Sequence, residues 1–197
     1  MKKLLLILAL SFPGTCIAQT PTQIGGISLG SDIHDYDQYI KAQTTLPIRF
    51  MEYLEEVELD RLPGFKSGYL AYGNCAEPGK IVRIKLKYRD SSKAFFKELL
   101  EKYKDRFGKP DKWLGDPFHV ITAWQWSFSD NGQQVELYLH HNLSDEEQKL
   151  GNSVKLTLTN SILQEQACFT EKFPDYRKSK TPEKPGHVVT WKDLIPK

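Results

Sequence analysis

Side chains alternate strictly between apolar and basic from Val82 to Tyr88, within a predicted strand over 81–88, and this alternation constrains the fold more than any other feature of the sequence. The basic residues of one parity are Arg83, Lys85 and Lys87. Successive side chains on a β-strand point to opposite faces, so this strand must have one buried face and one solvated face. Such strands are typical of an antiparallel sheet that is covered on one side.

Similar patterns predict further strands along the chain. Asp130-Asn131-Gly132 separates two of them and is a strong signal for a hairpin turn. Residues 48–60 are compatible with a strand or a helix, and we favour a strand because several apolar residues share one parity. The other predicted strands cover residues 68–72, 120–128, 134–142 and 153–160.

One helix is strongly indicated. Phe95, Leu99, Tyr103 and Phe107 recur every four residues, and Gly108 then ends the pattern. These aromatic and aliphatic side chains would lie along one stripe of the helix. We expect this stripe to pack against the apolar face of the sheet.

A second, shorter helix is predicted over residues 31–40, so the order helix-then-three-strands occurs twice along the chain. The predicted fold class is therefore α+β: an antiparallel β-sheet with helices packed on one face and a pseudo-repeated layout. The predicted domains are a signal peptide at 1–18, a single α+β domain at 19–171 and a basic, Lys- and Pro-rich tail at 172–197.

The first eighteen residues predict export. Lys2 and Lys3 precede an apolar run that is too short to span a bilayer, and Ala18 ends a segment suited to cleavage. This pattern is typical of a bacterial secretory signal peptide. We therefore expect a periplasmic or secreted protein, with no transmembrane segment after the signal is removed.

Cleavage after Ala18 would remove Cys16 and leave two cysteines, Cys75 and Cys168. An even pair in an oxidising compartment predicts one disulfide bond. Two free buried thiols are the alternative. A redox-active pair is disfavoured because the two residues do not form a Cys-x-x-Cys motif.

The charge balance excludes an extended nucleic-acid footprint. Lys2 and Lys3 account for the whole formal net charge of +2, so the chain after Ala18 is neutral. Basic residues are concentrated in the tail, which has seven of them against three acidic residues between Lys172 and Lys197. A contact between this tail and an anionic surface is a possible role, and a solvated tail is the simpler expectation.

The leading functional hypothesis is a non-catalytic binding protein that recognises an envelope protein or peptide. It rests on the predicted solvated face of the sheet, which offers hydrogen-bonding groups of mixed charge. The sequence contains none of the standard nucleophile, phosphate-loop or zinc motifs, and we expect no cofactor and no metal site. The candidate binding residues are Arg83, Lys85, Lys87, Trp113, Tyr138 and His140.

Two other functions stay open. A small periplasmic hydrolase or metal-dependent enzyme could use Asp116, His119 and His140 as acid–base groups or ligands. His140 and His141 are neighbours on a predicted strand, so they cannot both face one site. A small-ligand carrier would instead need a cavity between the helix and the sheet.

Overall fold

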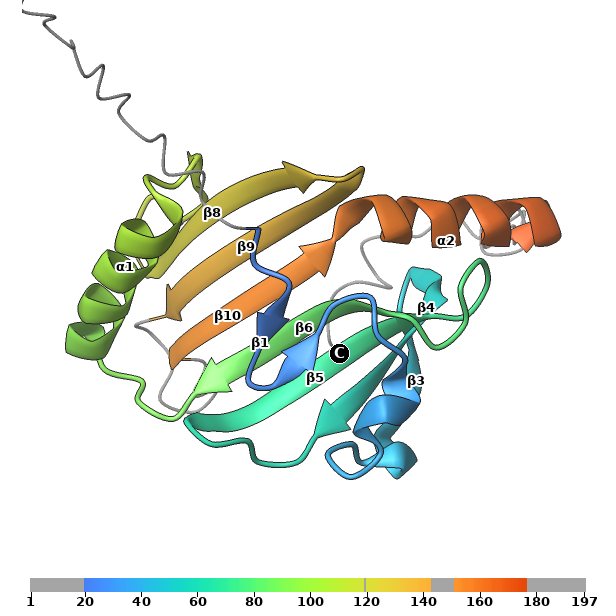
Figure 1. Cartoon of the computed structure of the whole chain (residues 1–197), viewed down its shortest axis with the longest axis horizontal. Helices are drawn as coiled ribbons and strands as arrows, with labels where there is room; N and C mark the ends of the chain where they lie inside the picture. Colours follow the sequence, from blue (N-terminus) through green and yellow to red (C-terminus); the bar gives the residue numbers. More distant parts are fainter. Residues whose placement is uncertain (1–19, 119, 143–150, 177–197) are drawn as a thin grey trace, which may run out of the picture.

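The computed structural model describes residues 20–118, 120–142 and 151–176 (Figure 1). The predicted signal peptide, His119 and the tail beyond residue 176 lie outside the described residues. The expectations for those segments therefore stay predictions.

The described part of the chain forms an α+β fold around an eight-stranded antiparallel sheet, as predicted. The spatial order of the strands is β3-β4-β5-β6-β10-β9-β8-β7. Their bounds are β3 Leu46–Ile48, β4 Met51–Leu59, β5 Phe65–Gly73, β6 Ile81–Tyr88, β7 Lys112–Trp113, β8 Ile121–Asp130, β9 Gln133–Asn142 and β10 Gly151–Leu158.

The remaining elements pack around this sheet. A small antiparallel hairpin, β1 (Gln23–Ile24) with β2 (Ile27–Ser28), precedes it. Two helices pack against the sheet, α1 (Lys93–Phe107) and α2 (Thr159–Lys172). Two short 3-10 helices, at Ile33–Tyr36 and Ala42–Thr44, lie between the hairpin and β3.

Two sequence predictions need correction. The helix predicted over 31–40 is only the 3-10 turn at Ile33–Tyr36, where Asp32 caps the backbone N–H of His34. The helix α2 was not predicted at all. Residues 48–60, which were ambiguous, contain the strand β4.

The sheet has two similar halves that meet at its centre. Strands β3 to β6 form the first half and are followed by α1, and strands β7 to β10 form the second half and are followed by α2. The last strand of each half, β6 and β10, pair with each other in antiparallel fashion (Figure 1). The duplicated layout is thus present, but each helix closes its half instead of opening it.

The apolar face of the sheet carries the main core, and α1 packs there. Trp126 of β8 is 2% exposed, and its indole N–H donates to the carbonyl of Gly108 at 2.9 Å. The Tyr103 ring of α1 lies 5.9 Å from it, between ring centroids. The expectation that the aromatic stripe of this helix packs against the apolar face of the sheet is confirmed.

A buried polar pair fixes the start of α1. The imidazole of His141, 2% exposed, stacks on Phe96 of α1 with ring centroids 5.0 Å apart. His141 Nδ1 lies 2.7 Å from Oδ1 of Asn152, whose amide donates to the carbonyls of Asp90 and Ser92 just before the helix. His141 is therefore a structural histidine.

A disulfide and a buried carboxylate hold α2 in place. Cys75 and Cys168 form the predicted disulfide, with Cα atoms 5.9 Å apart. One helical turn earlier, Glu165 is 2% exposed and accepts backbone N–H groups of Cys75, Ala76 and Glu77 at 2.7 to 3.0 Å. Three N–H donors satisfy a carboxylate that would otherwise be costly to bury.

Candidate functional site: the cationic centre of the polar sheet face

A single row of side chains crosses the polar face of the sheet from strand to strand. Pairing places Tyr69 opposite Lys85, Lys85 opposite Lys155, and Lys155 opposite Tyr138. Directly paired residues share one face of a sheet, so the four side chains lie in line. The row reads Tyr–Lys–Lys–Tyr and is symmetric about the β6–β10 pairing.

Basic residues are concentrated at the middle of this row. Arg83 and Lys87 flank Lys85 on β6 and point to the same face, because they are two positions away. Lys155 is the adjacent basic residue on β10. Among the side chains that β6, β9 and β10 place on this face, Glu136 is the only carboxylate. We call Arg83, Lys85, Lys87 and Lys155 the cationic centre.

Lys87 and Lys155 are partly withdrawn from water, whereas Lys85 is exposed, and this burial affects the two ammonium groups. Burial, and then the charges of Arg83 and Lys85, lower the pKa of Lys155. Burial, followed by Lys85 and Lys66, likewise lowers the pKa of Lys87. Both shifts have the sign expected for cations that face other cations.

Aromatic and polar groups on β9 support one side of the centre. The Nζ atom of Lys155 lies 4.0 Å from the centroid of the Tyr138 ring, a cation–π distance. The Tyr138 hydroxyl donates to the carboxylate of Glu136, which also accepts the side-chain amide of Gln125 at 3.1 Å. Burial and the neighbouring Glu136 raise the pKa of Tyr138, so its hydroxyl stays protonated. Glu136 is thus hydrogen-bonded to Tyr138 and Gln125, and its charge offsets part of the effect of the neighbouring cations on Lys155.

His140 lies at one end of a second cross-strand row, which includes Lys87 of the cationic centre. It pairs with Ser153 of β10, which itself pairs with Lys87 of β6. Burial, then Lys155 and Lys85, lower the pKa of His140 to about 4, so its imidazole is neutral at pH 7. Its Nε2 atom is buried and has no hydrogen-bond partner among the described residues.

A small hollow adjoins these side chains. Its volume is about 160 Å³, and it opens between β6, β9 and β10. Three lysines, Lys85, Lys87 and Lys155, line it, and none of the described residues around it is acidic. Its other lining residues are Ile121, His140, His141, Asn142, Gly151 and Ser153.

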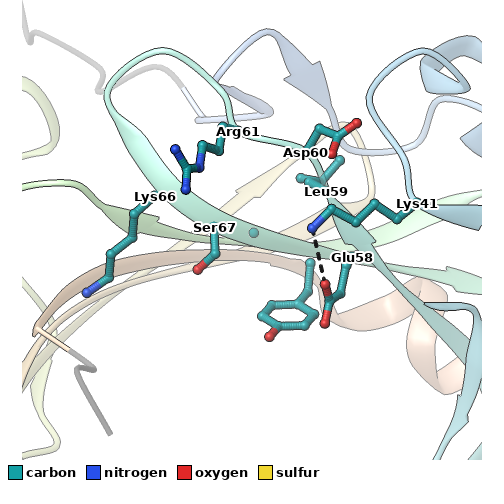
Figure 2. Close-up of a pocket in the computed structure, with 9 residues that line it drawn as sticks. Lys41, Glu58, Leu59, Asp60, Arg61, Lys66 and Ser67 are labelled. Atoms are coloured by element: carbon teal, nitrogen blue, oxygen red, sulfur yellow. Dashed lines mark hydrogen bonds and ion pairs between the residues drawn. The ribbon is translucent and has the colours of Figure 1, made fainter. Parts of the chain in front are cut away.

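A larger hollow lies beside β4 and β5, in the first half of the sheet. Figure 2 shows this pocket, which has a volume of about 480 Å³. Here basic and acidic groups are mixed: Lys41 pairs with Glu58 at 3.4 Å, and Asp60 lies near Arg61 in the chain. Tyr69 lines this pocket too, so it continues the polar row toward the edge of the sheet.

The structure brings five of the six predicted binding residues onto one face. Arg83, Lys85, Lys87, Tyr138 and His140 lie there, on β6 and β9. Trp113 does not join them. Trp113 lies on the edge strand β7 and pairs with Trp124 of β8. Trp124 packs against the apolar core, so Trp113 lies on the apolar face of the sheet.

The residues of the enzyme hypothesis serve other purposes where they are described. The carboxylate of Asp116 accepts backbone N–H groups of Phe118 and Ile121 within its own loop, and these bonds lower its pKa. His140 faces lysines, which disfavour a bound cation. Across the described ranges, no three His, Cys, Asp or Glu side chains are grouped as metal ligands.

The carrier hypothesis requires space beneath α1. Phe96, Tyr103 and Trp126 occupy the interface between this helix and the sheet, and their rings contact neighbouring aromatic rings. A ligand could enter there only by displacing these side chains.

No helix in the described part of the chain is long and apolar enough to cross a membrane.

Alternation predicts that Lys155 lies on the solvated face of the sheet, but it gives no reason to include this lysine among the candidate binding residues. Tyr69 was not singled out. The deciding fact is the pairing of β6 with β10, which joins segments about 70 residues apart. Local patterns carry no information on that pairing.

Comparisons with protein-family models, curated proteins and solved structures found no match for this chain.

Proposed function

We propose that the chain is an exported, non-catalytic binding protein whose cationic centre binds an acidic segment of an envelope protein or peptide. The observation that carries this proposal is the direct cross-strand pairing of Lys85 with Lys155 between Arg83 and Lys87. Like charges placed opposite each other destabilise a sheet. A fold keeps such an arrangement where the charges serve a partner, because function commonly costs stability.

The dimensions of the row suit a short extended peptide. Neighbouring strands lie about 4.8 Å apart, so the row from Tyr69 to Tyr138 spans roughly 14 Å across four strands. An extended chain advances about 3.3 Å per residue, so four or five residues would cover this distance. Two carboxylates on alternate residues would then lie about as far apart as Lys85 and Lys155. Tyr69 and Tyr138 would contact the peptide on either side.

The disulfide supports the proposed location. Disulfides persist in oxidising compartments, and Cys75–Cys168 closes a long loop of the chain. Together with the signal peptide that the sequence predicts, this bond favours the periplasm or the extracellular space. An acidic segment of another envelope protein is the partner class that such a location offers.

The test uses a fluorescein-labelled peptide of alternating Glu and Gly, and a matched peptide of alternating Gln and Gly. We expect the Glu peptide to bind in a fluorescence anisotropy titration and the Gln peptide to bind at least tenfold more weakly. Affinity should fall as salt rises, because exposed charges are screened.

Two variants locate the binding surface. The double variant Arg83→Ala/Lys85→Met should lose at least tenfold in affinity for the Glu peptide. Lys97→Met, which removes an exposed lysine from α1, should bind like the parent protein. Equal affinity for the two peptides, or equal loss in both variants, would show that the cationic centre is not a binding surface.

A further inference from the structure

The small hollow between β6, β9 and β10 has a chemical character of its own. We infer that it is a subsite for one oxyanion, of the carboxylate or phosphate type, held by Lys85, Lys87, Lys155 and the ring of His140. The inference rests on the proposed function, since it names the group that would anchor an acidic segment. It also makes a claim that can be tested without any peptide.

The size of the hollow fits a small polyatomic anion. Its volume is about 160 Å³, and a water molecule takes up about 30 Å³ in the liquid. A carboxylate or phosphate group therefore fits, with room for one or two waters. A larger headgroup or a nucleotide would have to extend out of the hollow across the face.

The charge of the hollow selects for anions. Its lysines come from two strands, and Lys85 is directly opposite Lys155. Lys87 pairs with Ser153, which lies two residues before Lys155 on β10 and also lines the hollow. Among the described residues no acidic side chain lines it, and Glu136 is engaged with Tyr138. An oxyanion would replace the mutual repulsion of three ammonium groups with charge-assisted hydrogen bonds.

The chemistry of His140 completes the subsite. Its ring lines the hollow, while His141 points its own ring to Phe96 on the other face of the sheet. A neutral imidazole can donate one hydrogen bond from a ring nitrogen, and Nε2 of His140 lacks a partner among the described residues. A small movement of the ring toward a bound oxygen would give this atom a partner. Burial, and then Lys155 and Lys85, keep the ring neutral in the absence of an anion, and a bound anion should make its protonation easier.

The experiment measures the unfolding midpoint and the His140 ring resonances of the whole disulfide-bonded protein. Sodium phosphate, sodium acetate and N-acetylglutamate are titrated separately at pH 7, with sodium chloride keeping the ionic strength constant. We expect at least one of these oxyanions to raise the midpoint and shift the His140 resonances saturably. His141 should shift much less, because its ring lies on the opposite face.

A pH titration gives a second, independent measurement. Saturating oxyanion should raise the pKa of His140 above its value in chloride. Binding of phosphate alone would indicate a phosphate subsite, and binding of acetate or N-acetylglutamate would indicate a carboxylate subsite. Responses identical to those in chloride, for all three oxyanions, would overturn the inference.

Matched variants assign the effect to the hollow. Lys155→Met and Lys87→Met should each weaken oxyanion binding at least tenfold, and Lys97→Met should leave it unchanged. Retained binding in both hollow variants would contradict the assignment. If oxyanions bind and the Glu peptide does not, the subsite stands and the peptide proposal fails. If the peptide binds and the oxyanions do not, the reverse holds.

Discussion

The two faces of the sheet differ in how their side chains meet their neighbours. On the apolar face, Trp126 and Phe96 are nearly fully buried and contact aromatic or hydrogen-bonding partners. On the polar face, Lys85 and Lys155 are neighbours of like charge at the very centre of the sheet. The apolar face is packed as a stable core requires, whereas the polar face places two like charges opposite each other at its centre. Departures of this kind are expected where a protein binds something.

This comparison makes a general prediction about substitutions. Removing side chains from the apolar face should lower the free energy of unfolding by several kcal/mol. Removing charge from the cationic centre should raise it while weakening binding. The following experiments test the contrast in order of decreasing effect.

Trp126→Ala should destabilise the protein by about 3–5 kcal/mol, because it creates a cavity in a close-packed core and leaves the carbonyl of Gly108 without its indole donor. Urea unfolding followed by circular dichroism measures this loss. Trp113→Ala on the edge strand β7, where the side chain is 41% exposed, should cost much less. Similar losses for the two tryptophans would contradict the distinction between core and edge.

Removal of the disulfide should lower stability by about 4 kcal/mol, since it releases a long loop in the unfolded chain. The double variant Cys75→Ser/Cys168→Ser is compared with the parent by urea unfolding. Binding of the Glu peptide should be unchanged below the transition, because the bond joins α2 to the β5–β6 loop and not to the cationic centre. Lost binding by a variant that remains folded would link the two regions.

Acidification should destabilise the protein through His140. Its pKa is about 4 in the folded protein and near 6.5 when unfolded, so the unfolded chain binds the proton more readily. The free energy of unfolding should therefore fall by about 2 kcal/mol as pH decreases from 6.5 to 4, after allowing for solvent screening. His140→Gln should show a smaller decrease over the same range. An equally steep decrease would assign it to other groups.

Lys155→Met should raise the free energy of unfolding by about 0.5–1 kcal/mol, since it removes one member of a like-charged cross-strand pair and retains an apolar stem. Lys97→Met should change stability by less than about 0.5 kcal/mol, as surface substitutions usually do. Chemical unfolding at low salt gives the clearest difference. Destabilisation by Lys155→Met would show that its contact with the Tyr138 ring outweighs the repulsion.

Local patterns predicted the features that depend on a few consecutive residues. The alternation in β6, the turn at Asn131-Gly132 and the aromatic stripe of α1 are all confirmed. At the turn, Asn131 and Gly132 both have positive φ, as a two-residue hairpin loop of this kind requires. The disulfide was also predicted, because only two cysteines remain once Cys16 is set aside.

The helix α2 escaped prediction for a physical reason. It begins directly at Thr159, after the last residue of β10, and Leu158 at its N-cap provides no side-chain hydrogen bond. A helix start is usually recognised by a capping Ser, Thr, Asp or Asn followed by an apolar stripe. The attachment of α2 instead comes from Glu165 and Cys168, whose partners lie about 90 residues earlier.

Strand β4 was ambiguous because Phe50 and Leu54 break its alternation and Glu55 interrupts the apolar parity. In the structure Leu54 is fully buried and lies opposite Gly73, and a side chain at that glycine would collide with Glu165 of α2. The position is therefore buried by a helix that the sequence did not reveal. Prediction of the candidate site was limited in the same way. Alternation identified five of its residues, but whether they lie together depends on the pairing of β6 with β10.

The position of β10 has a consequence for how the protein folds. It is the last strand among the described residues, yet it lies between β6 and β9 at the centre of the sheet. Until β10 is in place, the meander β3–β6 and the strands β7–β9 share no backbone ladder, and each exposes an open edge. Pairings between such distant segments close slowly. The cationic centre has residues on both β6 and β10, so it forms only when these two strands pair. A chain in which β10 is not yet paired would lack the proposed binding surface.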